Sequence, residues 1–349
     1  MNPEIKAYSK KYTLKFKRPA GTSRGILTSK DVWIITVYNN STGQKGIGEC
    51  SPLWGLSIDR RDSYEQKLAE VCENTGDYDF YLEKGLKDYP SIRFGLEMAL
   101  KNLTAGTEHL YFPSKFTLGQ DYIEINGLVW MGEFEFMRKQ IVEKIESGFS
   151  CIKLKIGAID FQKEIELIKT IRREFTAEDI EIRVDANGAF TAEKALEKLK
   201  ILSDYNLHSI EQPIRQGQWT EMAKLCETSP LAIALDEELI GITDTKRKVK
   251  MIKTIKPQYI ILKPSLLGGF KASEEWIEIA GNNGTKWWIT SALESNTGLN
   301  AIAQWTYTLG NKMPQGLGTG QLFSNNFYSP LYIEEGKLRF KPEYTTVNK

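Results

Sequence analysis

The chain has 349 residues, of which 41% are hydrophobic and 26% charged, and its 46 Lys and Arg nearly balance 45 Asp and Glu. This composition is typical of a soluble globular protein, and it leaves no excess positive charge for binding nucleic acid or an anionic membrane. The four cysteines are scattered and there are only two histidines, which argues against a disulfide scaffold, a thiolate zinc site or a mechanism with several imidazoles. Because no apolar signal segment or membrane span is evident, we expect a cytoplasmic protein.

The first third of the sequence predicts a small α+β domain in which strands come first and helices follow. The strand segments are Tyr12–Phe16, Val32–Tyr38 and Lys45–Cys50, and the helical segments are Ser63–Cys72 and Ser91–Leu103. We assign residues 1–120 to this domain and expect the tail, residues 321–349, to return to it, because residues 331–342 have the pattern of a hairpin.

From about Ile123 onward, short apolar segments alternate with amphipathic helical ones. The strand segments are 125–130, 151–157, 180–188, 208–214, 231–239, 259–265, 287–295 and, as an eighth, 315–320. The helical segments are Phe134–Ser147, Phe161–Phe175, Ala192–Ser203, Met222–Cys226, Thr245–Ile252, Ser273–Ala280 and Gly298–Tyr307. This alternation predicts an α/β fold with a (β/α)8 barrel over residues 121–320.

Charged residues recur near the carboxyl ends of these strands, where barrel enzymes carry their chemistry. They are Lys153, Lys155, Asp185, Glu211, Asp236 and Lys263. Taken singly, each has an ordinary alternative as a solvated strand residue, a turn former or a cap. Taken together, they recur once per βα unit, and Ile152 and Leu154 would face the surrounding helices and leave both lysines of that strand inside the barrel. The common register therefore predicts one convergent site.

The electrostatics of such a site suggest its chemistry. Three converging carboxylates repel one another, and a divalent cation relieves that repulsion. A ligand set made only of oxygen, without His or Cys, favours Mg2+, with Mn2+ as a substitute. A lysine whose pKa is lowered by neighbouring cations can act as a general base. A metal opposite a lysine base suits removal of a proton from the carbon next to a carboxylate, with charge stabilisation of the resulting enediolate.

The residues at this point resemble the enolase superfamily, and within it the muconate-lactonising subgroup, for which a lysine base and Mg2+ are familiar. The resemblance covers almost the whole chain through the motifs KLK, DANG, EQP, LDEE and LKPS. It implies an enolase-like barrel, in a regular or a modified form, with a capping domain. It also implies that Asp185, Glu211 and Asp236 bind the metal, that Lys155 and Lys263 flank the substrate as catalytic residues, and that Lys153 lies near the substrate carboxylate.

Within the subgroup, the chain looks most like the o-succinylbenzoate synthase family of menaquinone biosynthesis. Arg183 and Ser291 match positions that this resemblance links to substrate binding, and residues 21–25 and 48–55 look like the loops that close over the barrel. Dipeptide epimerases usually carry an Asp-x-Asp in the eighth strand, whereas residues 316–320 contain no acid, and mandelate-racemase-like enzymes use a late histidine that is missing here.

The resemblance therefore implies a hydro-lyase that dehydrates 2-succinyl-6-hydroxy-2,4-cyclohexadiene-1-carboxylate to 2-succinylbenzoate. Three activities of the same subgroup stay open as alternatives: N-acylamino acid racemase, dipeptide epimerase and muconate-type cycloisomerase. From another class, a ligand-binding barrel without catalysis also stays open, including one that binds phosphate through its glycines. We expect a small-molecule carboxylate as the partner, no nucleic acid and no membrane, and we leave open whether the chain forms a homo-oligomer.

Overall fold

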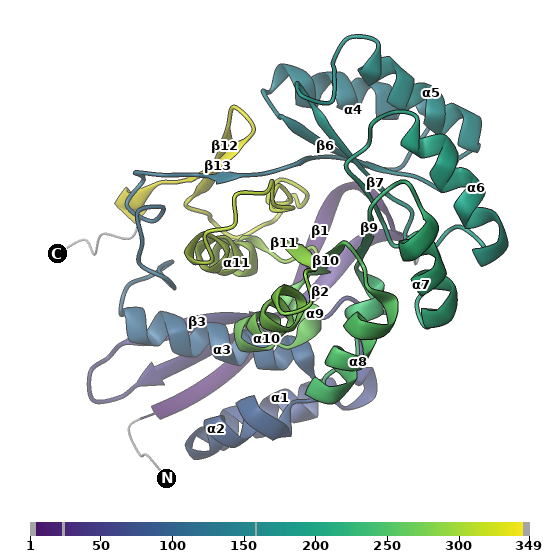
Figure 1. The fold of residues 1–349 in the computed structure, drawn as a ribbon. Helices are drawn as coiled ribbons and strands as arrows, with labels where there is room; N and C mark the ends of the chain where they lie inside the picture. The colour runs from purple at the N-terminus through teal and green to yellow at the C-terminus, as the bar shows by residue number, and fades with distance from the viewer. Residues whose placement is uncertain (1–4, 23–24, 158, 345–349) are drawn as a thin grey trace.

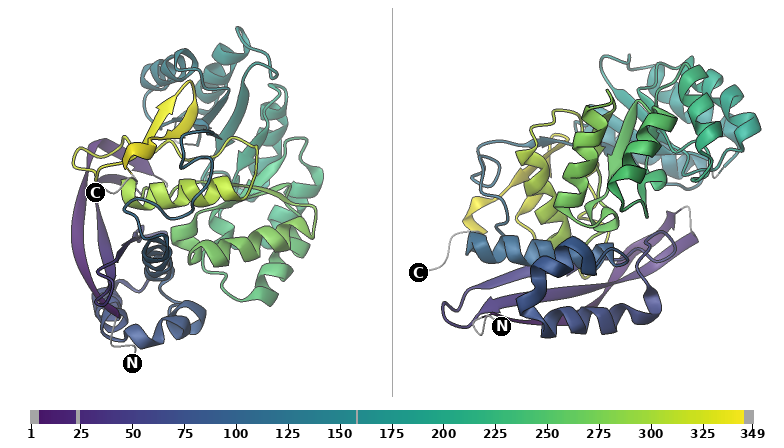
Figure 2. Two further views of the ribbon diagram at one scale, coloured as in Figure 1. Left: turned by 90° about the vertical axis from the view of Figure 1, so that its left-hand side faces the viewer. Right: turned by 60° about the horizontal axis from the view of Figure 1, so that its bottom comes forward.

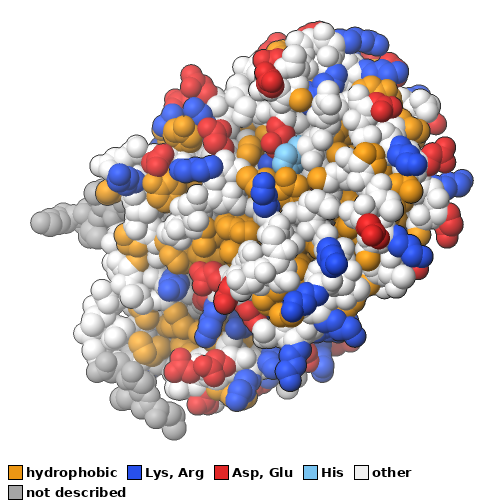
Figure 3. All heavy atoms as spheres, in the orientation of Figure 1, with side chains coloured by type: hydrophobic (Ala, Val, Ile, Leu, Met, Phe, Trp, Pro, Cys, Tyr) orange, Lys and Arg blue, Asp and Glu red, His pale blue; other side chains and the backbone are white. Residues whose placement is uncertain are grey.

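The computed structural model describes residues 5–22, 25–157 and 159–344. Ser23 and Arg24, in the first of the two expected capping loops, lie outside the described residues, as does the last part of the tail from residue 345. Within the described ranges, no helix has the length and apolar character needed to cross a bilayer. The face of the molecule shown in Figure 3 carries acidic and basic side chains that are interspersed over most of its area.

The N-terminal part is an antiparallel sheet of order β1-β2-β3 with helices packed against it (Figure 1). Its strands are β1 (Ile5–Thr22), β2 (Gly25–Asn39) and β3 (Lys45–Cys50), and its helices are α1 (Tyr64–Glu73), α2 (Tyr78–Phe80) and α3 (Pro90–Ala105). Strands β1 and β2 form a hairpin much longer than the sequence predicts. Glycines allow α3 to lie directly on β3, since a Cβ atom on Gly48 would stand 1.8 Å from the carbonyl oxygen of Gly95. The predicted order of strands followed by helices is confirmed.

The larger part is a curled parallel sheet of seven strands in the order β11-β10-β9-β8-β7-β6-β5, surrounded by helices (Figure 1). Its strands are β5 (Gly127–Val129), β6 (Cys151–Lys155), β7 (Glu181–Asp185), β8 (Ser209–Glu211), β9 (Ile233–Leu235), β10 (Tyr259–Leu262) and β11 (Lys286–Ile289). The helices are α4 (Phe134–Glu146), α5 (Phe161–Arg172), α6 (Ala192–Ser203), α7 (Trp219–Thr228), α8 (Thr245–Ile255), α9 (Pro264–Leu267), α10 (Phe270–Gly281) and α11 (Asn296–Thr308). The predicted α/β barrel fold with an N-terminal domain is confirmed.

The eighth barrel strand expected at residues 315–320 is reduced to isolated bridges. Gln315 bridges to Ile125 and Gly316 bridges to Thr290 of the segment after β11, so this segment joins the two ends of the curled sheet. Pro314 has no amide hydrogen to donate, and three glycines follow within six residues, which disfavours a regular strand here. The barrel is therefore closed by irregular backbone rather than by a full strand.

The tail forms the expected hairpin, β12 (Leu331–Glu334) and β13 (Lys337–Phe340). Strand β13 pairs with β4 (Ile123–Glu124), next to the barrel, while the preceding segment bridges to β1 through Phe323 and Phe16. The two parts of the molecule also meet at α3, which packs on β3 and contacts α9 (Figure 2). The exact domain boundaries remain a prediction.

Candidate active site

Lys153 and Lys155 lie side by side on β6, and both point into the barrel, as their alternation with apolar residues predicts. Ile152 and Leu154 on the other face are at most 1% exposed and belong to the main hydrophobic core. Parallel barrel strands are covered by helices on the outside, so the only place left for the two ammonium groups is the interior. The strand thus positions two cations at the barrel mouth.

The three acidic residues predicted as metal ligands come together beneath these lysines. Asp185 and Glu211 are register partners at the ends of β7 and β8, and Asp236 directly follows β9. All three are at most 2% exposed. The Nζ atom of Lys153 lies 3.0 Å from Asp185 and also contacts Glu211, while Lys263, directly after β10, contacts Asp236 and lies 4.0 Å from Glu211. Each lysine therefore bridges two of the carboxylates.

The charges set the pKa values within this cluster. Burial raises the pKa of Glu211 to about 8, with Asp185 as the next contribution, and burial also raises the pKa of Asp236. Burial opposes ionisation of Asp185 as well, but Lys153 and Lys155 outweigh it and hold the pKa of Asp185 well below its usual value. Burial disfavours the ammonium forms of Lys153 and Lys263, yet the surrounding carboxylates raise both pKa values. The expected lowering of a lysine pKa is thus not found at these two positions.

The acidic cluster fits a divalent cation by two observations. Its ligands are all oxygen, the donor type that Mg2+ and Mn2+ favour. In addition, Oε1 of Glu211 is buried without a hydrogen-bond partner, although buried oxygens of this kind are almost always paired. No three His, Cys, Asp or Glu side chains in the described ranges are already arranged as a metal site. Lysine ammonium groups lie on these carboxylates instead, so a metal would have to share or displace those contacts.

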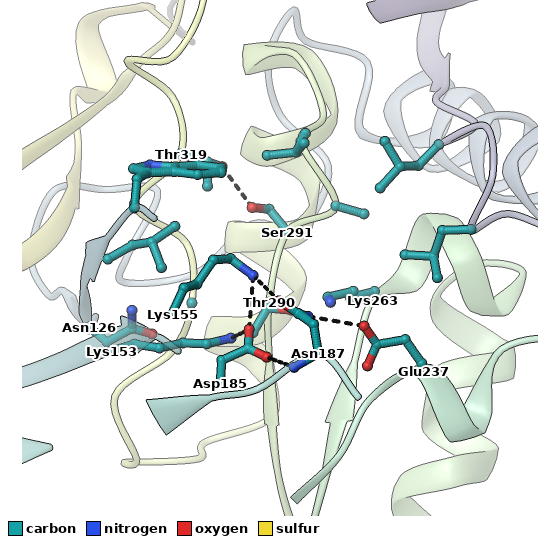
Figure 4. Close-up of a pocket in the computed structure, with 18 residues that line it drawn as sticks. Asn126, Lys153, Lys155, Asp185, Asn187, Glu237, Lys263, Thr290, Ser291 and Thr319 are labelled. Carbon is teal, nitrogen blue, oxygen red and sulfur yellow. Dashed lines mark hydrogen bonds and ion pairs between the residues drawn. The ribbon is translucent and has the colours of Figure 1, made fainter. Parts of the chain in front are cut away.

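Lys155 is held by two neighbours. Its Nζ atom lies 3.0 Å from Oδ2 of Asp185 and donates to Oδ1 of Asn187 at 2.7 Å. The amide group of Asn187 in turn donates to Glu237 at 3.0 Å. Figure 4 shows Lys155 and Lys263 pointing toward each other from different strands, above Asp185. The two lysines predicted to be catalytic therefore lie at one pocket.

That pocket has a volume of about 110 Å³ and lies between the barrel mouth and the N-terminal part. Leu53 and Leu56, from the second of the two expected capping loops and the segment after it, line it on one side. Ser291, predicted to bind substrate, lines it on another, where its hydroxyl group lies 2.7 Å from that of Thr319. The wall formed by Gly316, Gly318 and Thr319 carries no acid, as the sequence indicated.

Arg183, also predicted to bind substrate, does not line this pocket. Arg183 is 1% exposed and precedes Asp185 by two residues on the same strand, deeper in the barrel. The guanidinium group stacks on Trp288 at 4.3 Å, and its Nε donates to Glu181 at 2.6 Å and its Nη1 to the carbonyl of Pro314 at 2.8 Å. The placement two residues before Asp185 gave the expected face, but Arg183 lies deeper in the barrel interior, beneath the site, and its role in substrate binding stays a prediction.

Several pocket residues were not singled out from the sequence. They are Leu53, Leu56, Asn126, Leu128, Trp130, Asn187, Glu237, Thr290 and Thr319. Asn187 and Glu237 had a usable signal, because Asn187 follows Asp185 at a spacing of two and Glu237 is next to Asp236. The others come from loops and strand ends far apart in the chain, so only the fold brings them together.

Comparison with known proteins agrees with this geometry. Residues 137–343 match the enolase C-terminal domain-like family. The chain is 49% identical to the o-succinylbenzoate synthase of Desulfotalea psychrophila, over 93% of this chain and 96% of that protein. These findings show that the chain belongs to the enolase superfamily, through its C-terminal domain-like barrel. Within that superfamily it is similar to the o-succinylbenzoate synthase named above.

Solved structures extend the comparison. The crystal structure of MenC from Desulfotalea psychrophila superimposes with a TM-score of 0.85 and 45% identity, over 96% of this chain and 99% of that one. By sequence alone, the chain is also similar to the D-Ala-D/L-Ala epimerase of Cytophaga hutchinsonii, with 29% identity over 69% of this chain and 67% of that protein. The muconate lactonizing enzyme of Pseudomonas fluorescens, at 18% identity and a TM-score of 0.81 over 96% of this chain and 94% of that one, shares the fold.

Proposed function

We propose that the chain is an o-succinylbenzoate synthase, a hydro-lyase that converts 2-succinyl-6-hydroxy-2,4-cyclohexadiene-1-carboxylate to 2-succinylbenzoate and water in menaquinone biosynthesis. The observation that carries the proposal is the convergence of Lys155 and Lys263 on one pocket above three buried carboxylates. The near-full-length similarity to an enzyme of this name supports the choice of substrate.

The metal in this proposal is Mg2+, held by Asp185, Glu211 and Asp236. When bound, it would supply positive charge to stabilise the negative charge that develops on the substrate carboxylate. The buried Oε1 of Glu211, which accepts no hydrogen bond, supports this assignment. Lys153, which touches two of the proposed ligands, adds a positive charge beside the substrate carboxylate. Because Mn2+ prefers the same kind of ligand, we expect it to replace Mg2+.

The chemical step assigns different work to the two catalytic lysines. Lys155 takes the proton from the carbon that bears the carboxylate, and the C–O bond to the neighbouring hydroxyl then breaks as the ring becomes aromatic. The proton taken by Lys155 returns to the leaving hydroxyl, which departs as water, so the two bonds break on the same face. Lys263 stays protonated in this scheme, and its charge faces the developing aromatic ring from the other side.

The pocket wall favours this dehydration over dipeptide epimerisation. A dipeptide carries an ammonium group, which needs an acidic partner when it is taken out of water. The only acids among the described pocket residues are Asp185 and Glu237, and both already face lysines or Asn187. The segment that carries acids in dipeptide epimerases contributes only Gly316, Gly318 and Thr319 here.

The test is direct. Purified protein with Mg2+ is mixed with the cyclohexadiene substrate, and aromatisation is followed by ultraviolet absorbance. We expect rapid turnover that EDTA abolishes and added Mg2+ restores. Protein that binds Mg2+ but does not aromatise this substrate would overturn the proposal, and α-proton exchange of N-acylamino acids in deuterated water would then test the racemase alternative.

A further inference from the structure

Lys30 is a buried lysine of the N-terminal domain that the catalytic scheme leaves without a role. It lies on β2 and is 6% exposed. Its Nζ atom donates to the hydroxyl of Ser51 at 2.7 Å and to the carbonyl oxygens of Ala292 and Leu293, each at 2.9 Å. An ammonium group has three protons to donate, so these three acceptors use all of them. A lysine of the N-terminal domain thus binds the barrel loop that contains Ala292 and Leu293.

Two buried glutamates complete this contact. Glu49, on β3, accepts hydrogen bonds from the backbone amides of Ser295 and Gly298, both at 2.8 Å. Glu294, in the loop itself, accepts from the amide of Ala292 at 2.6 Å and from the hydroxyl of Ser265. Both glutamates are 0% exposed, and both lie close enough to interact electrostatically with Lys30. Residues of β2 and β3 therefore hold the segment 292–298 across the domain interface.

The loop held in this way forms part of the pocket wall. Ser291, Ala292 and Leu293 all line the pocket. Leu293 has a φ of +62°, in the left-handed region that a leucine rarely adopts. A backbone of this kind is strained and persists only where its surroundings fix it. The hydrogen bonds from Lys30 to the carbonyls of residues 292 and 293 are among the contacts that hold this backbone.

We propose that Lys30 is a positioning residue of the active site, which holds the loop 291–293 in the shape that receives the substrate. It acts through the loop and does not touch the reacting atoms. The N-terminal domain thereby shapes the pocket from behind as well as covering it with Leu53 and Leu56. The substrate side of this proposal rests on the proposed function, whereas the hold on the loop does not.

The kinetic test compares Lys30→Met with the unaltered enzyme in the aromatisation assay, at a temperature well below the Tm of both. Methionine keeps the length of the side chain and removes its protons. We expect KM to rise about tenfold while kcat stays within about threefold, because the loop contacts the substrate and not the proton in transfer. Glu49→Gln, which keeps the shape and removes the charge, should shift KM in the same direction and serves if Lys30→Met does not fold.

A matched control is Glu97→Gln. Glu97, on α3, joins the same two parts of the molecule by accepting from the amides of Phe270 and Lys271, at 2.6 and 3.1 Å, and neither of those residues lines the pocket. This substitution should lower Tm and leave KM unchanged. A fall in Tm with unchanged KM in both Lys30→Met and Glu49→Gln would show a purely structural contact and overturn the proposal. A loss of kcat alone would also overturn it, because that result would place the effect at the catalytic lysines.

Hydrogen exchange separates this proposal from the proposed function. In Lys30→Met, the amides of residues 292–298 should exchange faster than in the unaltered protein, whereas in Glu97→Gln they should not. Unchanged exchange in Lys30→Met would refute the positioning role whether or not the enzyme aromatises the substrate. Faster exchange in a protein without turnover would support the hold on the loop and reject only the proposed substrate.

Discussion

The ammonium group of Lys155 donates to the side-chain oxygen of Asn187 at 2.7 Å. Asn187 has a φ of +43°, a conformation that asparagine tolerates better than most residues, and its amide also bonds to Glu237. The amide group therefore fixes the proposed base from one side while Asp185 contacts it from the other. In Figure 4 these groups form one continuous chain of polar contacts along the lining of the pocket.

Replacing Asn187 by alanine should lower kcat by about tenfold to a hundredfold, because the base would no longer be held in line with the substrate proton. KM should change much less. The control is Asn206→Ala, since Asn206 also has a positive φ, of 50°, and does not line the pocket. Steady-state kinetics at saturating Mg2+ measure both variants. An equal loss of kcat in the two variants would mean that backbone strain causes the effect. Full activity in Asn187→Ala would contradict the positioning role of Asn187.

Glu211→Gln should weaken Mg2+ binding by about tenfold or more, because it removes a charged ligand of the proposed site. Titration calorimetry on protein freed of metal with EDTA measures the dissociation constant. The exposed Glu166, which pairs with Lys169 on the surface, provides the control variant Glu166→Gln. An unchanged dissociation constant in Glu211→Gln would mean that the metal is bound elsewhere.

Asp59 predicts a pH dependence of stability away from the active site. The group is 5% exposed, and burial raises its pKa from an ordinary 3.8 to about 6, against hydrogen bonds from Ser57 and Ser91. The folded state thus favours the protonated form, so the contribution of Asp59 to stability is complete below about pH 3.8 and is lost as the pH rises through 6. Asn at this position does not titrate.

We therefore expect Asp59→Asn to gain stability relative to the unaltered protein by up to about 3 kcal/mol as the pH rises from 4 to 7. Urea denaturation at several pH values, followed by tryptophan fluorescence, measures this difference. Other carboxylates titrate in both proteins and cancel in the comparison. A difference that stays flat, or that falls with rising pH, would contradict the burial argument.

Arg183→Met should lower the free energy of unfolding by about 1 to 3 kcal/mol and leave KM for the substrate unchanged. The guanidinium group bonds to Glu181 and Pro314 and stacks on Trp288, all beneath the site, and it does not line the pocket. Denaturation and kinetics on the same preparation test both halves. A rise of tenfold or more in KM with stability retained would instead restore the substrate contact that the sequence suggested.

The barrel and its lysine–carboxylate set could be predicted from the sequence because both follow from a simple period. Strands buried on both faces are apolar, so a charge at the end of each strand stands out, and the βα repeat places those ends at one height. Lys155, Asp185 and Glu211 were predicted to lie together in this way, and their roles in the site stay proposals. The prediction of an eighth strand was wrong because residues 315–320 close the barrel through single bridges. Such bridges leave no regular pattern in the sequence.

Lys30 shows what the sequence could not give. Its spacing from Val32 indicates that the side chain lies on the buried face of β2, but nothing nearby indicates what a buried ammonium group would meet there. It donates to the backbone carbonyl groups of Ala292 and Leu293, more than two hundred residues away. Every residue has such a carbonyl group, so the sequence cannot identify which ones a lysine will bind. The position of Arg183 outside the pocket lining could not be predicted for a related reason, because the alternation of a strand gives the face of a side chain and not its depth in the barrel.

The most direct test compares the unaltered enzyme with Lys155→Ala, both at saturating Mg2+. The measurement is the rate at which each aromatises 2-succinyl-6-hydroxy-2,4-cyclohexadiene-1-carboxylate. A positioned general base contributes about a hundredfold to ten-thousandfold to the rate of the chemical step. We therefore expect kcat of Lys155→Ala to fall by at least about a hundredfold, while the variant keeps its fold and binds Mg2+. Rapid aromatisation by Lys155→Ala would contradict the assignment of the base. No aromatisation by the unaltered enzyme would contradict the proposed reaction.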